Sequence, residues 1–138
     1  MGDSDILVSL YAGAYGPTLR VDTQSDVHLD LVRAQFASLA EGRQTAARLV
    51  AGGPWAFDGV NELTLAVDAR EPHGARVVAG AVPPDTRVDW RMSGDGWEQC
   101  LGLLEGLADR PGHQYLTEAR KGFLLVELAF RERRPAVG

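Results

Sequence analysis

Hydrophobic and polar residues follow two different spacings along this chain of 138 residues, and these spacings separate strands from helices. The apolar run over residues 6–11 predicts a first strand. Gly16-Pro17 marks a turn, so residues 18–21 are expected to fold back on that strand as a hairpin.

The stretch after this hairpin has the spacing of a helix. Its apolar positions recur at Leu29, Val32, Phe36 and Leu39. Together with Ser25 or Asp26 as the N-cap and Gly42 as a stop signal, they predict a helix over residues 26–41.

A second helix is predicted in the last third of the chain. Asp95 is expected to cap it, because Glu98 three residues later completes a pair that resembles a capping box. Pro111-Gly112 ends the helix. Its apolar face is formed by Trp97, Cys100, Leu101, Leu104 and Ala108.

Short strands are predicted over residues 45–50, 63–67, 76–82, 88–92 and 123–130. The last of these is apolar on both faces except at Glu127, which favours a central position in a sheet. Residues 51–61 are expected to form a longer loop. Its Trp55 and Phe57 would serve as a lid or cover a sheet edge.

The order of these elements indicates the fold class. It lacks the regular strand–helix alternation of a doubly wound parallel sheet. We therefore predict an α+β fold, with a mostly antiparallel sheet of about five to six strands and two helices packed on one face. Because we find no repeat or linker, residues 1–138 are predicted to form a single domain.

Charge is distributed unevenly between the two halves. Residues 1–69 have nine acidic and four basic residues, for a net charge of −5, whereas acids and bases balance in residues 70–138. Nucleic-acid binding requires a basic stripe, which this chain lacks. An acidic surface either attracts a basic protein partner or keeps the domain soluble. The longest apolar run is too short for a membrane span, and the single cysteine fits a reducing, cytoplasmic location.

Reactive residue types are few and do not form a known motif. None of the histidines has the spacing of a metal-ligand pair. Cys100 falls on an apolar helix face, where a thiol usually serves as packing. Since glycine-rich phosphate motifs are also missing, we expect no catalytic residue, no metal and no cofactor.

Glu127 is the carboxylate that needs an explanation, because it interrupts an apolar strand. Such a group must face solvent, pair with another group or shift its pKa. The partner would be His113, Tyr115 or an arginine such as Arg91. The interaction would be either a structural hydrogen bond or part of a functional pocket.

The segment Gly112–Tyr115 is expected to be a compact polar loop. Its side chains, His113, Gln114 and Tyr115, would either lock the second helix to the last strand or contact a ligand. Tyr15 and Trp55 also fall in predicted loops, where exposed aromatic residues favour protein contacts.

The motif Gly-His-Gln-Tyr-Leu at residues 112–116, between a helix and a closing strand with an acidic residue near its end, resembles small bacterial immunity proteins of polymorphic-toxin systems. The resemblance covers residues 86–130. It implies a protein that binds and blocks a toxin domain without catalysis.

We therefore expect a protein-binding surface on the acidic first helix and the loops. Its candidate residues are Asp26, Asp30, Gln35, Tyr15, Trp55, His113, Gln114, Tyr115 and Glu127. One alternative is a small-ligand binder or enzyme with a pocket near His113, Tyr115 and Glu127. Another is an accessory subunit that dimerises through a sheet edge, so both a monomer and a homodimer are considered.

Overall fold

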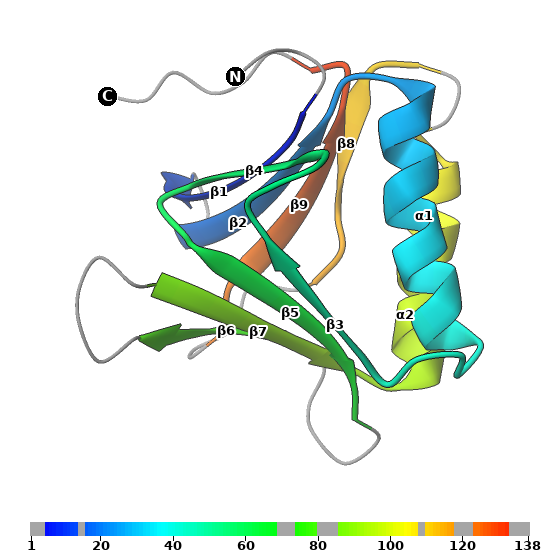
Figure 1. Cartoon of the computed structure of the whole chain (residues 1–138). Helices are drawn as coiled ribbons and strands as arrows, with labels where there is room; N and C mark the ends of the chain where they lie inside the picture. Colours follow the sequence, from blue (N-terminus) through cyan, green and yellow to red (C-terminus); the bar gives the residue numbers. More distant parts are fainter. Residues whose placement is uncertain are drawn as a thin grey trace.

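The computed structural model describes residues 5–13, 16–68, 74–79, 86–107, 110–117 and 123–132. In these residues two helices and nine strands form two sheets with a helical layer beside them (Figure 1). The α+β class is thus confirmed.

The larger sheet has five strands, in the spatial order β4 (Trp55–Asp58), β1 (Ile6–Gly13), β2 (Gly16–Thr23), β9 (Leu125–Phe130) and β8 (Gly112–Tyr115). The hairpin of β1 and β2 is antiparallel, as is the pair β8–β9. In contrast, β1 pairs in parallel with β4, and β2 pairs in parallel with β9.

The smaller sheet has four strands, in the order β3 (Ala46–Val50), β5 (Glu62–Val67), β7 (Thr86–Met92) and β6 (Gly74–Ala79). Its central pair, β5–β7, is parallel. The expected sheet of five to six mostly antiparallel strands is therefore replaced by two mixed sheets. Residues 80–82 of the predicted strand 76–82 lie outside the described residues.

The turn between β3 and β4 moves the chain from one sheet to the other. Gly52 and Gly53 both have positive φ, 132° and 57°, a conformation that favours glycine. Gly52 pairs with Trp55 as an isolated bridge. The segment predicted as a loop over residues 51–61 therefore contains an edge strand, since pairing with β1 orders residues that show little strand pattern by themselves.

The helix α1 (Asp26–Ala40) begins at Ser25, whose hydroxyl accepts from the backbone N–H of His28 at 3.2 Å. Its predicted bounds differ from the observed ones by a single residue. The helix α2 (Gly94–Glu105) begins at Ser93, which accepts from the N–H of Gly96. Asp95 was predicted to be this cap; the serine takes the position because the helix starts two residues earlier.

The core lies between the two sheets and the helices. Phe36 of α1 packs against Trp90 and Trp97, with ring centroids 5.7 and 5.6 Å away. The Trp97 indole N–H donates to Ala66 O at 2.9 Å, which fixes α2 against the end of β5. Burial of these large aromatic rings holds the helical layer in place. Neither described helix has the length and apolar character needed to cross a membrane.

Candidate functional site

The outward face of the five-stranded sheet carries a buried group of charged side chains. Arg20 on β2 and Glu127 on β9 are paired residues in the parallel register of these strands. The Arg20 Nη1 donates to Glu127 Oε1 at 2.8 Å, and both side chains are about 95% buried, with exposures of 5% and 6%. Glu127 therefore pairs with an arginine, as one of the sequence-based alternatives expected, but this arginine is Arg20 rather than Arg91.

Strand geometry explains why this group lies opposite the core. Leu19 and Val21 turn into the core, so their neighbours Arg20 and Asp22 turn to the other face. On β9, Val126 is a core residue and the adjacent Glu127 faces outward with Arg20. The register of two strands far apart in sequence is what brings opposite charges together.

Further contacts complete this group, which we call the Arg20 cluster: Tyr11, Arg20, Asp22, Glu127 and Glu132. The Tyr11 hydroxyl donates to Glu127 Oε1 at 3.2 Å. The Arg20 guanidinium also lies 3.5 Å from Asp22 Oδ2 and 3.4 Å from Glu132 Oε1. A single guanidinium is thus shared by three carboxylates.

This arrangement changes the protonation of its members. Burial by itself would lower the pKa of Arg20, but the charges of Asp22 and Glu127 outweigh it and raise the pKa. Burial, then the charge of Glu127, raises the pKa of Tyr11 above its usual value. Arg20 is therefore held as a cation and Tyr11 as a neutral hydrogen-bond donor, which suits a structural rather than a proton-transfer role.

The predicted polar loop at Gly112–Tyr115 is the edge strand β8. Its pairing with β9 places His113 opposite Ala129 and Tyr115 opposite Glu127. The loop prediction failed because these polar residues form a strand only when β9 provides a neighbour. His113 and Tyr115 are both exposed, and their rings meet edge to face at 5.4 Å.

His113 contacts the Arg20 cluster at its rim. Its Nδ1 lies 2.7 Å from Glu132 Oε2, and Glu132 in turn contacts Arg20. Gln114 faces the other way, toward the end of α2. Its side-chain nitrogen lies near Gly106, 3.7 Å from the place that a Cβ atom would take on that glycine. The structure therefore groups His113, Tyr115 and Glu127 on one sheet face. Neither described pocket is lined by any of the three.

A second candidate surface is the outward face of α1 and α2, which lie side by side (Figure 1). The two helices hold five carboxylates and one arginine, for a net charge of −4 with His28 neutral. These carboxylates belong to Asp26, Asp30, Asp95, Glu98 and Glu105. The net charge of the whole chain is −5. The two helices therefore account for −4 of it, and the charges of all other residues nearly cancel.

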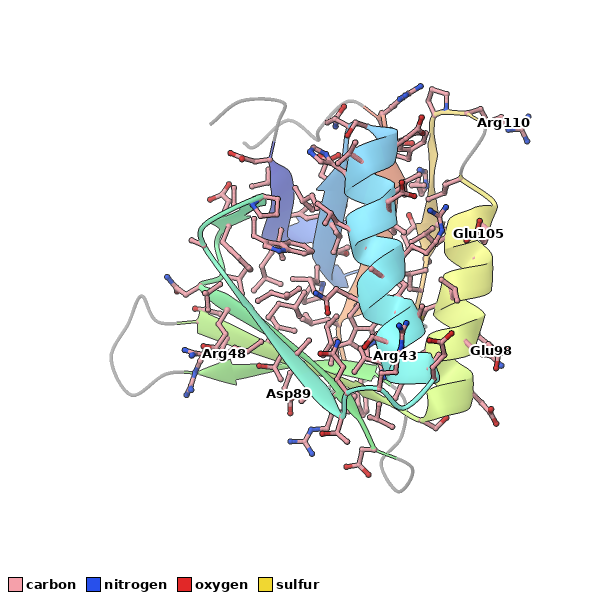
Figure 2. The ribbon with its side chains drawn as sticks, turned by 45° about the vertical axis from the view of Figure 1, so that its right-hand side comes forward. Arg43, Arg48, Asp89, Glu98, Glu105 and Arg110 are labelled. Carbon is pink, nitrogen blue, oxygen red and sulfur yellow. The ribbon has the colours of Figure 1, made fainter. Side chains whose placement is uncertain are left out.

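Exposed apolar side chains lie among these carboxylates. Val27 is 66% exposed, and Leu31 and Leu103 are 37% and 38% exposed. Arg33 joins the helices through a contact of 2.6 Å to Glu105, and it also pairs with Asp30. Figure 2 shows Glu98 and Glu105 on the outer side of α2. We call this surface the acidic helix face.

The remaining predicted contact residues are not on the acidic helix face. Gln35 and Trp55 are half-buried and line one narrow apolar pocket between α1, β3 and β4. Gln35 also accepts from the Gln44 side chain at 3.1 Å. Tyr15 lies outside the described residues. The contact surface expected from the sequence is thus divided among four places, one of them the end of α2 beside Gln114.

The structure also decides the role of the lone thiol. Cys100 is 1% exposed, and burial raises its pKa to about 12. Its Sγ packs 3.6 Å from the Met92 sulfur. A thiol with this pKa is protonated at neutral pH and is a poor nucleophile. No group of three or more metal-ligating side chains occurs within the described ranges.

Sequence reasoning missed Tyr11, Arg20, Asp22 and Glu132. A signal for part of this set was present, because Thr18, Arg20 and Asp22 alternate with core residues along β2. Alternation gives the face of a residue but not its neighbour on the next strand. The Arg20–Glu127 pair was therefore not accessible from one sequence.

Comparison with known proteins gave no relative: no family model, no curated protein and no solved structure matches this chain.

Proposed function

We propose that this chain is a non-catalytic binding protein of the immunity type, which binds and blocks a bacterial toxin domain through the acidic helix face. The observation that carries the proposal is the combination on that face of a net charge of −4 with exposed Val27, Leu31 and Leu103. Such a surface suits a basic protein partner.

Each part of this surface has a physical role in the proposed complex. Clustered carboxylates speed the encounter with a basic partner, and this effect weakens with ionic strength. The exposed apolar side chains supply the area whose burial stabilises the bound state. Asp26 and Asp30 have side-chain exposures of 74% and 67%, so a partner can reach both.

The test uses a toxin domain encoded beside this gene and measures binding by calorimetry, together with protection of cells that express the toxin. We expect a 1:1 complex. Replacing Asp26 and Asp30 by lysine should weaken binding by about tenfold or more, because each exposed charge contributes on the order of 1 kcal/mol. Asp58→Lys on β4 is the matched control, since this exposed carboxylate belongs to the larger sheet.

Two results would refute the proposal. In the first, the wild-type protein neither binds the neighbouring domain nor protects cells. In the second, the control and the helix variants weaken binding equally, which would indicate a general effect of charge rather than a contact on α1.

A further inference from the structure

The strand β3 forms a free edge of the four-stranded sheet. It pairs with β5 on one side, and Val67 N–H donates to Thr45 O at 2.8 Å. Antiparallel pairs alternate between hydrogen-bonded and non-bonded residues. The backbone groups of Ala46, Arg48 and Val50 therefore turn away from β5. Within the described contacts, nothing bonds to these outward groups.

The opposite edge of the same sheet is covered. The Leu124 backbone N–H donates to Ala75 O on β6 at 2.8 Å, and the two residues form a bridge. The contrast identifies β3 as the edge of this sheet at which another strand can add. We call the outward backbone groups of Ala46, Arg48 and Val50 the β3 edge.

An apolar pocket adjoins the β3 edge. Leu49 turns inward from β3 and lines the pocket together with Trp55 of β4 and Phe36 of α1. The pocket has a volume of about 10 Å³, enough for one water molecule, and it lies next to the Gln35–Gln44 side-chain hydrogen bond that joins α1 to the segment before β3. Strand addition to such an edge offers main-chain hydrogen bonds for affinity.

The charge at the middle of the edge indicates the chemistry of the occupant. Arg48 is 71% exposed and contacts Glu62 on β5 at 2.7 Å. A strand laid along β3 would place its outward side chains beside Arg48, where an acidic residue is favoured. Its inward side chains would lie beside Leu49 on the core face of the sheet, where an apolar residue is favoured.

We propose that the β3 edge binds an extended segment of a partner protein by strand addition, with apolar side chains beside Leu49 on the core face of the sheet and an acidic side chain beside Arg48. This site is separate from the acidic helix face and does not depend on the function proposed for it.

A second copy of this chain is a poorer occupant. A twofold pairing of two β3 strands that uses the backbone groups of all three edge residues is centred on Arg48. It would set two Arg48 side chains directly opposite each other, and like charges in that position destabilise a strand pair. The same arginine that attracts an acidic strand thus disfavours self-association.

The test uses a blocked, fluorescein-labelled peptide of about seven residues, a typical strand length, that alternates valine with aspartate. The control peptide has the same sequence with lysine in place of aspartate. Fluorescence anisotropy measures binding. Amide hydrogen exchange, followed by NMR, measures protection of the backbone N–H groups of Ala46, Arg48 and Val50. We expect the aspartate peptide to bind, to protect these amides and to bind at least tenfold better than the lysine peptide.

Val50→Pro tests the backbone contact. The Val50 N–H points to the open edge, so proline removes no hydrogen bond within the protein, and edge strands tolerate it there. We expect Val50→Pro to weaken binding about tenfold, as loss of a hydrogen bond does. Val50→Ala is the matched control, because it shortens the same side chain and keeps the N–H; it should change binding by less than about threefold. Circular dichroism confirms that both variants fold.

Arg48→Glu tests the charge and should reverse the preference between the two peptides. The proposal is overturned if neither peptide binds at about 1 mM, the weak end of measurable affinity. Equal binding by Val50→Pro and Val50→Ala, or by the aspartate and lysine peptides, would also overturn it.

Discussion

Both sheets carry arginine–carboxylate pairs on their outward faces, and the two faces differ in burial. On the five-stranded sheet, Arg20 and Glu127 have side-chain exposures of 5% and 6%. On the four-stranded sheet, the Arg48 side chain is 71% exposed where it contacts Glu62, and Arg91 is 49% exposed where it contacts Asp89. The contact distances are nevertheless alike, at 2.8 Å for Arg20–Glu127 and 2.7 Å for each of the others.

Burial decides what each pair does. An exposed ion pair is screened by water and salt and stabilises the fold by little. A buried pair contributes little net energy compared with apolar residues, but breaking it leaves a charge with no compensation in a poor solvent. The Arg20 cluster therefore has a structural role, whereas the ion pairs on the smaller sheet remain exposed at the surface.

Removing the buried arginine should have the largest effect on stability. Arg20→Met leaves the carboxylates of Glu127, Asp22 and Glu132 without their shared cation. We expect the free energy of unfolding to fall by about 3–5 kcal/mol, as for other broken buried pairs. Urea denaturation measures the change. A loss below about 1 kcal/mol, the range of exposed pairs, would mean that solvent reaches the cluster.

A double substitution sharpens this result. Once Arg20→Met has been made, Glu127→Leu removes a buried charge that no longer has its partner. We expect the double variant to be more stable than the sum of the single effects indicates, by roughly 1–3 kcal/mol. A double-mutant cycle in urea gives the coupling energy, and additive effects would show that the two residues do not act as a pair.

Tyr11→Phe should have an intermediate effect and a characteristic pH dependence. It removes a hydrogen bond to Glu127, worth about 1.5–3 kcal/mol when the acceptor is charged. Folding raises the pKa of Tyr11 above its usual 10.0, so the folded state holds this proton more tightly. The resulting stability is present below pH 10 and is lost as the pH rises through the folded-state pKa.

Thermal unfolding at alkaline pH checks this prediction. In Tyr11→Phe the decline of stability above about pH 10 should be shallower than in the wild-type protein. An identical alkaline decline in both proteins would assign that titration to other groups.

Breaking the exposed Arg48–Glu62 pair should have the smallest effect on stability. Arg48→Ala removes the contact with Glu62, and we expect the free energy of unfolding to change by less than about 1 kcal/mol. The change should shrink further in high salt, because the charges are screened. Urea denaturation with and without added salt is the measurement. A larger loss that salt does not affect would remove the distinction between the two faces.

The sequence by itself determined the elements whose signals are local. The cap signal at Ser25 or Asp26, the helical spacing and Gly42 located α1 to within a residue of its observed end. The alternation in residues 88–92 matches the buried Val88, Trp90 and Met92 of β7. The need of Glu127 for a partner also followed from its apolar neighbours, because an unpaired buried carboxylate is too costly.

Tertiary structure decided which strands meet. Arg20 and Glu127 are 107 residues apart, and only the parallel register of β2 and β9 sets them opposite each other. The segments that become β4 and β8 were predicted as loops, since each is ordered by a neighbouring strand rather than by its own pattern. The turn at Gly52 and Gly53 is one of the places where the chain passes between the two sheets. Side-chain spacing specifies the face on which a residue lies, whereas its neighbour is chosen by the packing of the whole chain.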